Sequence, residues 1–238
     1  MNRLNKPKAI VFDYGGTLVK SHYFDGLKGT KEVLKYANNP FNVSAETVQT
    51  YAEKVLQDIG AFNPSMIMQV NGQALTRLIH SVHGISFTKT FEELDSIFLD
   101  AAEGHSLMDG MIELLDFLKS QHVRLAVLSN TGFMEESHRQ QLRKYGIEEY
   151  FEFFIATSDY MIRKPDKRIF DVALSKLRLN SDEVWYIGNK FEFDIQGAYN
   201  AHIYPVWINE ERNQALNSIE HLDVSTYYEL LEVLKIKW

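Results

Sequence analysis

Residues 8–18, Lys-Ala-Ile-Val-Phe-Asp-Tyr-Gly-Gly-Thr-Leu, constrain the fold of this chain more than any other segment. The apolar run Ala9–Phe12 is typical of a strand that is buried on both faces of a parallel sheet. Asp13 follows directly, and Gly15 and Gly16 let the backbone turn sharply and approach a ligand closely. The segment therefore predicts a buried strand with an acid at its carboxyl end, where open α/β sheets bind their ligands.

The composition narrows the class of protein and the kind of ligand. A chain of 238 residues can bury one core, or one core and an inserted subdomain. Its formal net charge of −7 argues against nucleic acid or an anionic membrane as partners, but a small anionic substrate fits a locally positive pocket. The absence of cysteine excludes disulfides, thiolate metal sites and cysteine nucleophiles. Residues 1–7 are polar and no apolar run reaches the ~18 residues of a membrane span, so we expect a cytoplasmic protein. The oligomeric state cannot be read from these features.

The chain changes its hydrophobic pattern twice. Between residues 21 and 105, apolar residues recur at helical spacing in the segments 48–59, 75–82 and 91–101, and Ser44 is placed to cap the first of these helices. We interpret this region as an all-helical insert. From Met108 onward, predicted helices alternate with predicted strands at 123–128, 153–156, 184–187 and 203–207. Pro205 favours an edge position for the last of these strands, and Ser225 can cap a final helix.

Alternating strands and helices predict an α/β fold with a Rossmann-like parallel sheet and helices on both of its faces. The predicted core domain comprises residues 1–20 and 106–238, and the helical insert comprises residues 21–105. No internal repeat or low-complexity segment interrupts this organisation.

Four loops at the carboxyl ends of these strands carry polar groups. Asp13 ends the first strand, and Ser129 and Asn130 follow the second as a hydroxyl and an amide suited to a phosphate cradle. Lys164 precedes a later helix as a compact positive charge. The segment 188–194, Gly-Asn-Lys-Phe-Glu-Phe-Asp, offers side-chain oxygens of the kind that a hard cation prefers. Taken alone, each group is more often a turn residue, a helix cap or a solvated charge than a functional group, but a parallel sheet brings all four to one edge.

In this order the four segments resemble the motifs of the haloacid dehalogenase superfamily. The resemblance rests on Asp13-Tyr14-Gly15-Gly16-Thr17, Ser129-Asn130, Lys164-Pro165 and the segment from Gly188-Asn189 to Asp194, and it covers nearly the whole chain. It implies a hydrolase in which Asp13 is the nucleophile and forms a covalent intermediate. It also implies that the helical insert is a cap domain, which covers the site and selects the substrate.

In the phosphatase members that the chain resembles, the motifs also bind a metal and the phosphoryl group. The resemblance implies Mg²⁺ held by Asp13, the backbone carbonyl of Gly15, Asn189 and Asp194. Ser129 and Lys164 would hold the phosphoryl oxygens, with Gly15, Gly16 and Asn130 completing the phosphate-binding loops. The expected function is therefore an Mg²⁺-dependent phosphatase that acts on a small phosphorylated metabolite.

The chain departs from the common family pattern at two positions. A second aspartate usually stands where Gly15 is, and it protonates the leaving oxygen and later activates water. Such a group is typically worth ~10²–10⁴-fold in rate, so we expect slower hydrolysis of ordinary alkyl phosphates unless another group replaces it. Asn189 stands where an aspartate is frequent, which removes one negative charge from the metal site and should lower its affinity.

The replacement for the missing acid is open at the level of sequence. His22, Tyr23 and Asp25 follow the first motif, and a histidine at position 22 is chemically suited to the task. An exposed loop histidine without a catalytic role is the other interpretation of His22. Alternatively the leaving group needs no proton, as in an acyl, aryl or anomeric sugar phosphate.

Two further functions compete with a phosphatase. A 2-haloacid dehalogenase would tolerate Gly15, because a departing halide needs no proton. The chain lacks the Ser-Ser-Asn run of those enzymes before Asp194, and Arg77 is the only arginine in the insert. The other alternative is a catalytically degenerate protein that binds or regulates, although retention of Asp13, Lys164 and Asp194 together argues against it.

Overall fold

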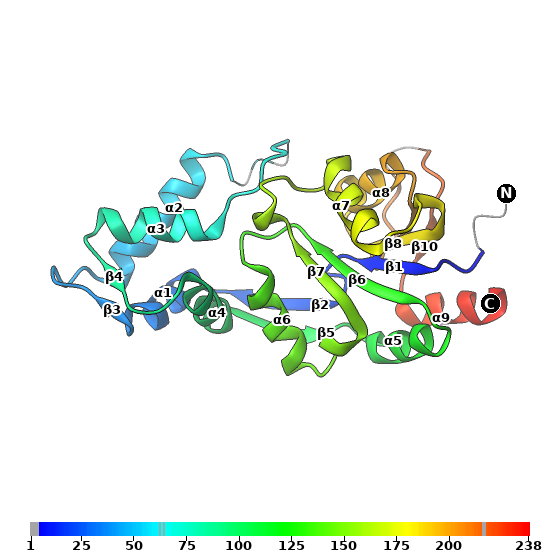
Figure 1. Ribbon diagram of the computed structural model, residues 1–238, viewed down its shortest axis with the longest axis horizontal. Helices are drawn as coiled ribbons and strands as arrows, with labels where there is room; N and C mark the ends of the chain where they lie inside the picture. Colours follow the sequence, from blue (N-terminus) through cyan, green and yellow to red (C-terminus); the bar gives the residue numbers. More distant parts are fainter. Residues whose placement is uncertain (1–4, 62, 64, 216–217) are drawn as a thin grey trace.

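A six-stranded parallel sheet forms the centre of the computed structural model, which describes residues 5–61, 63, 65–215 and 218–238 (Figure 1). The strand order is β10-β9-β8-β1-β6-β7. The bounds are β1 Ala9–Phe12, β6 Arg124–Ser129, β7 Phe151–Ala156, β8 Val184–Gly188, β9 Tyr204–Ile208 and β10 Leu222–Val224. Because β1 pairs with β6 on one side and with β8 on the other, Asp13 emerges at the middle of the sheet.

Helices cover both faces of this sheet, as predicted. Their bounds are α5 Met111–Ser120, α6 Glu135–Lys144, α7 Lys167–Leu177, α8 Gln196–Asn200 and α9 Tyr227–Lys237. Ile10 and Phe12 of β1 join the apolar cluster that contains residues of α5, α6 and α9. Ala9 and Val11 join a second cluster with residues of α7 and α8. The run Ala9–Phe12 is therefore buried on both sides. In the described part of the chain, no helix is both long enough and apolar enough to cross a membrane.

The insert between the first and second motifs lies to one side of the sheet (Figure 1). It contains α1 Gly26–Leu34, α2 Ala45–Asp58, α3 Gly72–Val82 and α4 Phe91–Ala102. Ser44 caps α2 by accepting a hydrogen bond from the N–H of Thr47, as predicted. The division of the chain at residues 20/21 and 105/106 stays a prediction.

The insert also contains strands that the periodicity analysis did not predict. The pair β3 Ala37–Asn38 and β4 Ser86–Phe87 lies within it, and the antiparallel pair β2 Val19–Phe24 and β5 Glu103–Leu107 connects it to the sheet. β5 begins directly after α4, and no proline separates the two elements. The helical pattern of residues 91–101 therefore gives no sign that a strand follows.

Two expectations about the carboxyl-terminal region are wrong. β9, which contains Pro205, is not an edge strand, because β10 pairs with it on the outer side. The proline is tolerated because β10 pairs only with Val206–Ile208 and leaves Pro205 outside the covered stretch. The last helix is capped by Thr226, which accepts a hydrogen bond from the N–H of Glu229, and not by Ser225.

Candidate active site

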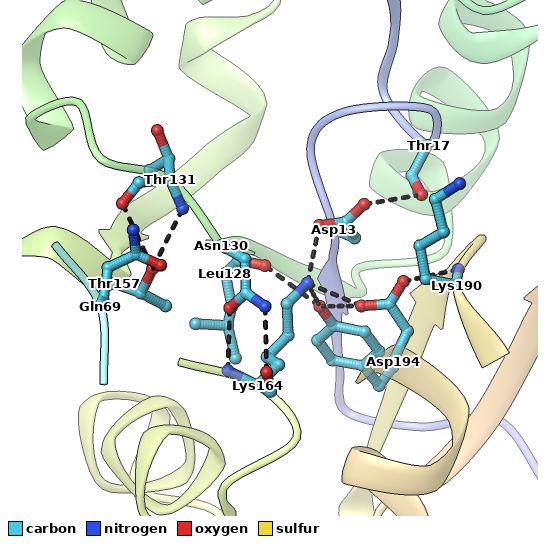
Figure 2. Close-up of polar contacts among 11 residues, drawn as sticks. Asp13, Thr17, Gln69, Leu128, Asn130, Thr131, Thr157, Lys164, Lys190 and Asp194 are labelled. Carbon is cyan, nitrogen blue, oxygen red and sulfur yellow. Dashed lines mark hydrogen bonds and ion pairs between the residues drawn. The ribbon is translucent and has the colours of Figure 1, made fainter. Parts of the chain in front are cut away.

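A buried ammonium group joins three of the four predicted strand ends (Figure 2). Nζ of Lys164 donates to Oδ1 of Asp13 at 2.7 Å, to Oδ1 of Asp194 at 2.6 Å and to the hydroxyl of Tyr186 at 2.7 Å. The Tyr186 hydroxyl lies 3.1 Å from the carbonyl oxygen of Leu128, to which it donates. All three N–H groups of Lys164 are thus used, and its side chain is fully buried.

Each member of this cluster is oriented by its own loop. The Thr17 hydroxyl donates to Oδ2 of Asp13 at 3.1 Å. Asn130 holds the Lys164 loop with two hydrogen bonds, because its Oδ1 accepts from the Lys164 N–H at 2.8 Å and its Nδ2 donates to the Lys164 carbonyl at 3.0 Å. The side-chain amide of Asn130 is therefore engaged in placing the lysine, which leaves phosphate contacts at this position to the backbone.

Gly188 allows Asp194 to reach the cluster. A Cβ atom at position 188 would lie 2.4 Å from Cβ and Cγ of Asp194. The N–H of Lys190 donates to Oδ2 of Asp194 at 2.9 Å and fixes the second carboxylate oxygen. The glycine is needed for close approach, in addition to the turn that the sequence suggests.

Burial and charge act in opposite directions on the ionisable groups of the cluster. Burial raises the pKa of Asp13 to about 6, with Lys164 opposing that rise and Asp194 adding to it. For Lys164, burial alone would lower the pKa, but the carboxylates of Asp13 and Asp194 raise it above the usual value. The lysine therefore remains an ammonium, while Asp13 is held as a carboxylate of raised basicity above about pH 6.

A cavity of about 440 Å³ opens onto Asp13. Of the residues predicted from the sequence it is lined by Asp13, Gly15, Gly16, Ser129, Asn130, Lys164 and Asp194. Gly15 is exposed there, and a Cβ atom at this position would meet nothing within 4 Å. The space that a second aspartate would need is therefore open, and steric exclusion does not explain the glycine.

Asn189 is the one predicted site residue that does not line this cavity. It lies beside Gly16, whose φ is +76° and whose hypothetical Cβ would come within 2.2 Å of Nδ2 of Asn189. Oδ1 of Asn189 is buried and has no hydrogen-bond partner among the described residues. An unsatisfied buried oxygen at this place is consistent with a metal ligand.

The metal ligands expected from the resemblance all carry oxygen. They are the carboxylates of Asp13 and Asp194, the amide of Asn189 and the backbone carbonyl of Gly15, which are oxygens of the kind that Mg²⁺ binds. In the described residues no group of three or more His, Cys, Asp or Glu side chains could hold a metal ion. The proposed set, with only two carboxylates, is therefore less acidic than many cation sites.

Several residues at this site were not identified from the sequence. Thr17 and Tyr186 contact the cluster directly, and Glu103 and His105 of β5 line the cavity. Tyr186 belongs to a buried apolar strand and carries no local signal of a polar role. His22, considered above as a proton donor, does not line the cavity, and its Nε2 lies 3.0 Å from Oγ of Ser106.

The insert is fastened to the loops that surround the site. The N–H of Gly72 donates to the carbonyl of Gly132 at 3.1 Å, and the Thr157 hydroxyl donates to Oε1 of Gln69 at 3.2 Å. In α4, Oδ2 of Asp95 accepts from the N–H of Met134 at 2.9 Å and from the Ser137 hydroxyl at 2.6 Å. Asp95 thereby caps the first turn of α6, where a carboxylate is favoured.

A second cavity, of about 340 Å³, lies among the helices of the insert. It shares Phe24, Gly132 and Phe133 with the cavity at Asp13, so the two adjoin. Its walls are mainly apolar, and no lysine or arginine of the described residues lines it. His80 is one of its polar groups. Nδ1 of His80 donates to the Thr76 carbonyl at 2.7 Å, and Nε2 is buried without a partner in the described residues.

We expect His138 to make the stability of the protein dependent on pH. Burial lowers its pKa to about 3, and the nearby His105 adds to the shift. Below the ordinary histidine pKa the unfolded chain takes up a proton that the folded chain refuses, so stability falls as pH decreases. We expect the His138 contribution to fall by about 2 kcal/mol between pH 8 and pH 5.

Urea unfolding at both pH values tests this expectation. His138→Gln should show a pH dependence that is smaller than that of the wild type by this amount. His22→Gln, which removes an exposed imidazole, is the matched control and should retain the wild-type dependence. Parallel pH profiles for the wild type and His138→Gln would contradict the assignment.

Comparison with known proteins gives relatives that extend over nearly the whole chain. Pyrimidine 5'-nucleotidase YjjG of Escherichia coli (strain K12) is 27% identical over 237 residues, which cover 94% of this chain and 96% of the relative. N-acylneuraminate-9-phosphatase of Rattus norvegicus is 23% identical over 240 residues, which cover 98% of this chain and 95% of the relative. Both relatives are named for the removal of phosphate from small molecules.

Solved structures share the fold at lower identity. A 2-haloacid dehalogenase from Pseudomonas syringae pv. Tomato DC3000 matches with a TM-score of 0.64 and 20% identity, covering 97% of this chain and 99% of that one. The HAD-hydrolase YfnB from Bacillus subtilis, solved bound to magnesium, matches with a TM-score of 0.60 and 17% identity, covering 97% and 99%. The family model described as haloacid dehalogenase-like hydrolase matches residues 10–208, which include all four strand-end loops. The chain belongs to the haloacid dehalogenase-like hydrolases.

Proposed function

We propose that this protein is an Mg²⁺-dependent phosphatase that acts on small phosphate monoesters through an aspartyl-phosphate on Asp13. The observation that carries the proposal is the buried carboxylate of Asp13, bonded to the Lys164 ammonium at 2.7 Å in a cavity that Ser129 also lines. A carboxylate oxygen of Asp13 would bond to phosphorus as the ester P–O bond breaks, and water would then restore the carboxylate. Lys164 and Ser129 would hold the phosphoryl oxygens and offset their charge.

Asp13, Asp194, Asn189 and the Gly15 carbonyl would hold Mg²⁺. When bound, the cation would neutralise part of the phosphoryl charge and align the phosphorus with Asp13. The partnerless Oδ1 of Asn189 supports this assignment. The loss of one carboxylate relative to the common family pattern favours weak Mg²⁺ binding.

The cavity of the insert supports a substrate whose leaving group is uncharged and mainly apolar. The cavity adjoins the one at Asp13, and no cationic side chain of the described residues stands on its walls to bind a second anionic group. Nε2 of His80 is an acceptor, because Nδ1 carries the proton that is donated to Thr76. A single hydroxyl or N–H on an otherwise apolar leaving group would satisfy it.

A dehalogenase is less well supported. In this structure Arg77 lies over the ring of Phe91, at 5.1 Å from its centroid, and it does not line the cavity at Asp13. The similarity to dehalogenase structures is at 20% identity and concerns the fold. A non-catalytic role is also less well supported, because the hydrogen-bonded cluster around Lys164 is complete.

Metal-dependent release of phosphate tests the proposal. The wild type should release phosphate from 4-nitrophenyl phosphate in the presence of Mg²⁺, and chelation with EDTA should abolish at least ~90% of the rate, because the metal offsets phosphoryl charge. Asp13→Asn, prepared in parallel, reveals any contaminating phosphatase. Equal rates with Mg²⁺ and with EDTA, or equal rates for both proteins, would overturn the proposal. Chloride release from 2-chloropropionate would favour the dehalogenase.

A pair of alkyl phosphates tests the leaving-group preference separately. Benzyl phosphate and glycerol 3-phosphate both have alkoxide leaving groups, but only the first has an apolar one. We expect kcat/KM to be at least ~10-fold higher for benzyl phosphate, since burial of one ring in an apolar cavity exceeds 1.4 kcal/mol. A preference for glycerol 3-phosphate would contradict the assignment of the insert cavity.

A further inference from the structure

β5 brings a histidine to the cavity at Asp13. In the antiparallel pair of β2 and β5, Ser21 lies opposite His105, and both residues line this cavity. His22, the neighbour of Ser21, does not line it. The register of these two strands therefore places His105, and not His22, at the cavity that contains Asp13.

The His105 side chain is held in one orientation. Its Nε2 lies 2.8 Å from Oε1 of Glu103, and only 3% of the side chain is exposed. The ring packs edge-on against Tyr14, with 6.0 Å between the ring centroids. Because the contact with Glu103 uses Nε2, it leaves Nδ1 of the ring open. A carboxylate on one nitrogen and a second nitrogen left open form the arrangement that proton-transfer catalysis uses.

The other titratable groups around the cavity are engaged in other contacts or tasks. Asp13, Lys164 and Asp194 form the buried cluster. His138 is fully buried, and its Nε2 lies 2.9 Å from the Thr131 hydroxyl. Glu103 and His105 remain, together with Lys190, whose backbone N–H rather than its ammonium contacts Asp194.

We propose that His105, oriented by Glu103, is the general acid and base that replaces the aspartate missing at Gly15. The proposal rests on the proposed phosphatase function. Gly15 and His105 line the same cavity as Asp13, and a Cβ atom at position 15 would meet nothing within 4 Å. The position of the missing acid and the histidine therefore border the same substrate. Glu103 is a positioning residue in this scheme, because it acts through the imidazole.

The proton transfers balance over the two half-reactions. In the first, an oxygen of Asp13 bonds to phosphorus, the ester P–O bond breaks, and the leaving oxygen takes the proton from Nδ1 of protonated His105. In the second, neutral His105 takes a proton from water at Nδ1 while the water oxygen attacks phosphorus. The bond between phosphorus and Asp13 breaks, and both the carboxylate and the protonated imidazole are restored.

Two substrates that differ in leaving ability test the first half-reaction. Benzyl phosphate releases an alkoxide that needs a proton, whereas 4-nitrophenyl phosphate releases a stable phenolate. His105→Gln should lower the rate of benzyl alcohol release by about 10²-fold or more, but should leave the first release of 4-nitrophenolate within about 3-fold of wild type. An equal loss in the first release from both substrates, or no loss in the release of benzyl alcohol, would overturn the proposal.

Rapid mixing tests the second half-reaction. With 4-nitrophenyl phosphate, His105→Gln should release one nitrophenolate per enzyme in a burst and then turn over slowly, because the aspartyl-phosphate lacks its base. The wild type should release nitrophenolate without a burst of comparable amplitude. A His105→Gln protein whose steady rate equals that of the wild type on this substrate would exclude the role as a base.

Restoring an acid at position 15 provides a test that misfolding cannot imitate. In a Gly15→Asp background, His105→Gln should cost less than about 3-fold on benzyl phosphate, against about 10²-fold in the wild-type background. His22→Gln is the control, and it should leave the rate of each background unchanged. A loss that is the same in both backgrounds would assign His105 a structural role. Absence of phosphate release from the wild type would instead refute the phosphatase function itself.

The dependence on the leaving group separates orientation by Glu103 from mere packing. Glu103→Gln should slow the first release of benzyl alcohol more than the first release of 4-nitrophenolate, because only the alkoxide needs the proton that the oriented imidazole of His105 delivers. Equal losses in the first release from both substrates would exclude the positioning role.

Discussion

Replacing Lys164 with methionine is expected to lower the free energy of unfolding by about 3–5 kcal/mol at pH 8 and to abolish turnover. The substitution removes the ammonium that bonds Asp13, Asp194 and Tyr186, and leaves two carboxylates buried together without a counter-charge. Methionine fills a similar volume, so the loss reports charge and hydrogen bonding rather than a cavity. Under the proposed function, turnover should fail because the phosphoryl oxygens would lose the ammonium of Lys164.

Urea unfolding of the metal-free protein measures this loss, with Lys167→Met as the matched control. Lys167 is exposed and pairs with Asp171 one helical turn away, so its replacement should cost less than about 0.5 kcal/mol. Because burial raises the pKa of Asp13 to about 6, protonation below that pH should relieve part of the Lys164→Met penalty. A penalty under about 1 kcal/mol at pH 8 would show that the buried carboxylates do not depend on Lys164.

Asp13→Asn should abolish phosphate release by at least ~10³-fold while making the metal-free protein more stable. The amide cannot act as the nucleophile, but its oxygen can still accept from Lys164. Because burial raises the pKa of Asp13 to about 6, ionisation of this carboxyl is costlier in the folded than in the unfolded chain. Removing the charge should therefore stabilise the fold by about 1–3 kcal/mol at pH 8.

The pH dependence of this gain has a defined sign. Below about pH 4 both states of wild-type Asp13 are protonated and the variant has no advantage. Between the ordinary pKa of aspartate and about 6, the unfolded chain is ionised and the folded chain is not, so wild-type stability falls as pH rises and the advantage of the variant grows. Above about pH 6 the difference should be constant. Unfolding curves with EDTA at several pH values measure it, and a variant less stable than wild type at pH 8 would contradict it.

The strand ends could be predicted because the signal for each is local. Asp13, Ser129, Lys164 and Asp194 each follow a short apolar run or precede a helical one, and in a parallel sheet the carboxyl ends of strands lie at one edge. Local signals did not predict the edge of the sheet correctly. Pro205 indicated an edge, but β10 is only three residues long and leaves little trace in the hydrophobic pattern.

β5 was missed for a similar reason. Its residues Glu-Gly-His-Ser-Leu show no strand alternation and follow α4 without an interval. The strand forms because β2 pairs with it, and that partner lies some 80 residues earlier in the chain. His105 could not be chosen over His22 from sequence, because the choice depends on which residue of each strand lies opposite the other.

The sequence by itself determined the parallel α/β fold and the order of the strand-end loops that carry Asp13, Ser129, Lys164 and Asp194, since these follow from short-range apolar patterns and strand order. Only the tertiary structure decided how the site is held together. Tyr186, which lies on an apolar strand, accepts the third hydrogen bond of the Lys164 ammonium. The side chain of Asn130 positions the loop that carries Lys164. In the sequence, Gly15 shows only that an acid is missing. In the folded protein, the space beside Gly15 is open, and His105 lines the same cavity. Pairing register and close approach between distant segments create these relations, and neither has a local signature in the chain.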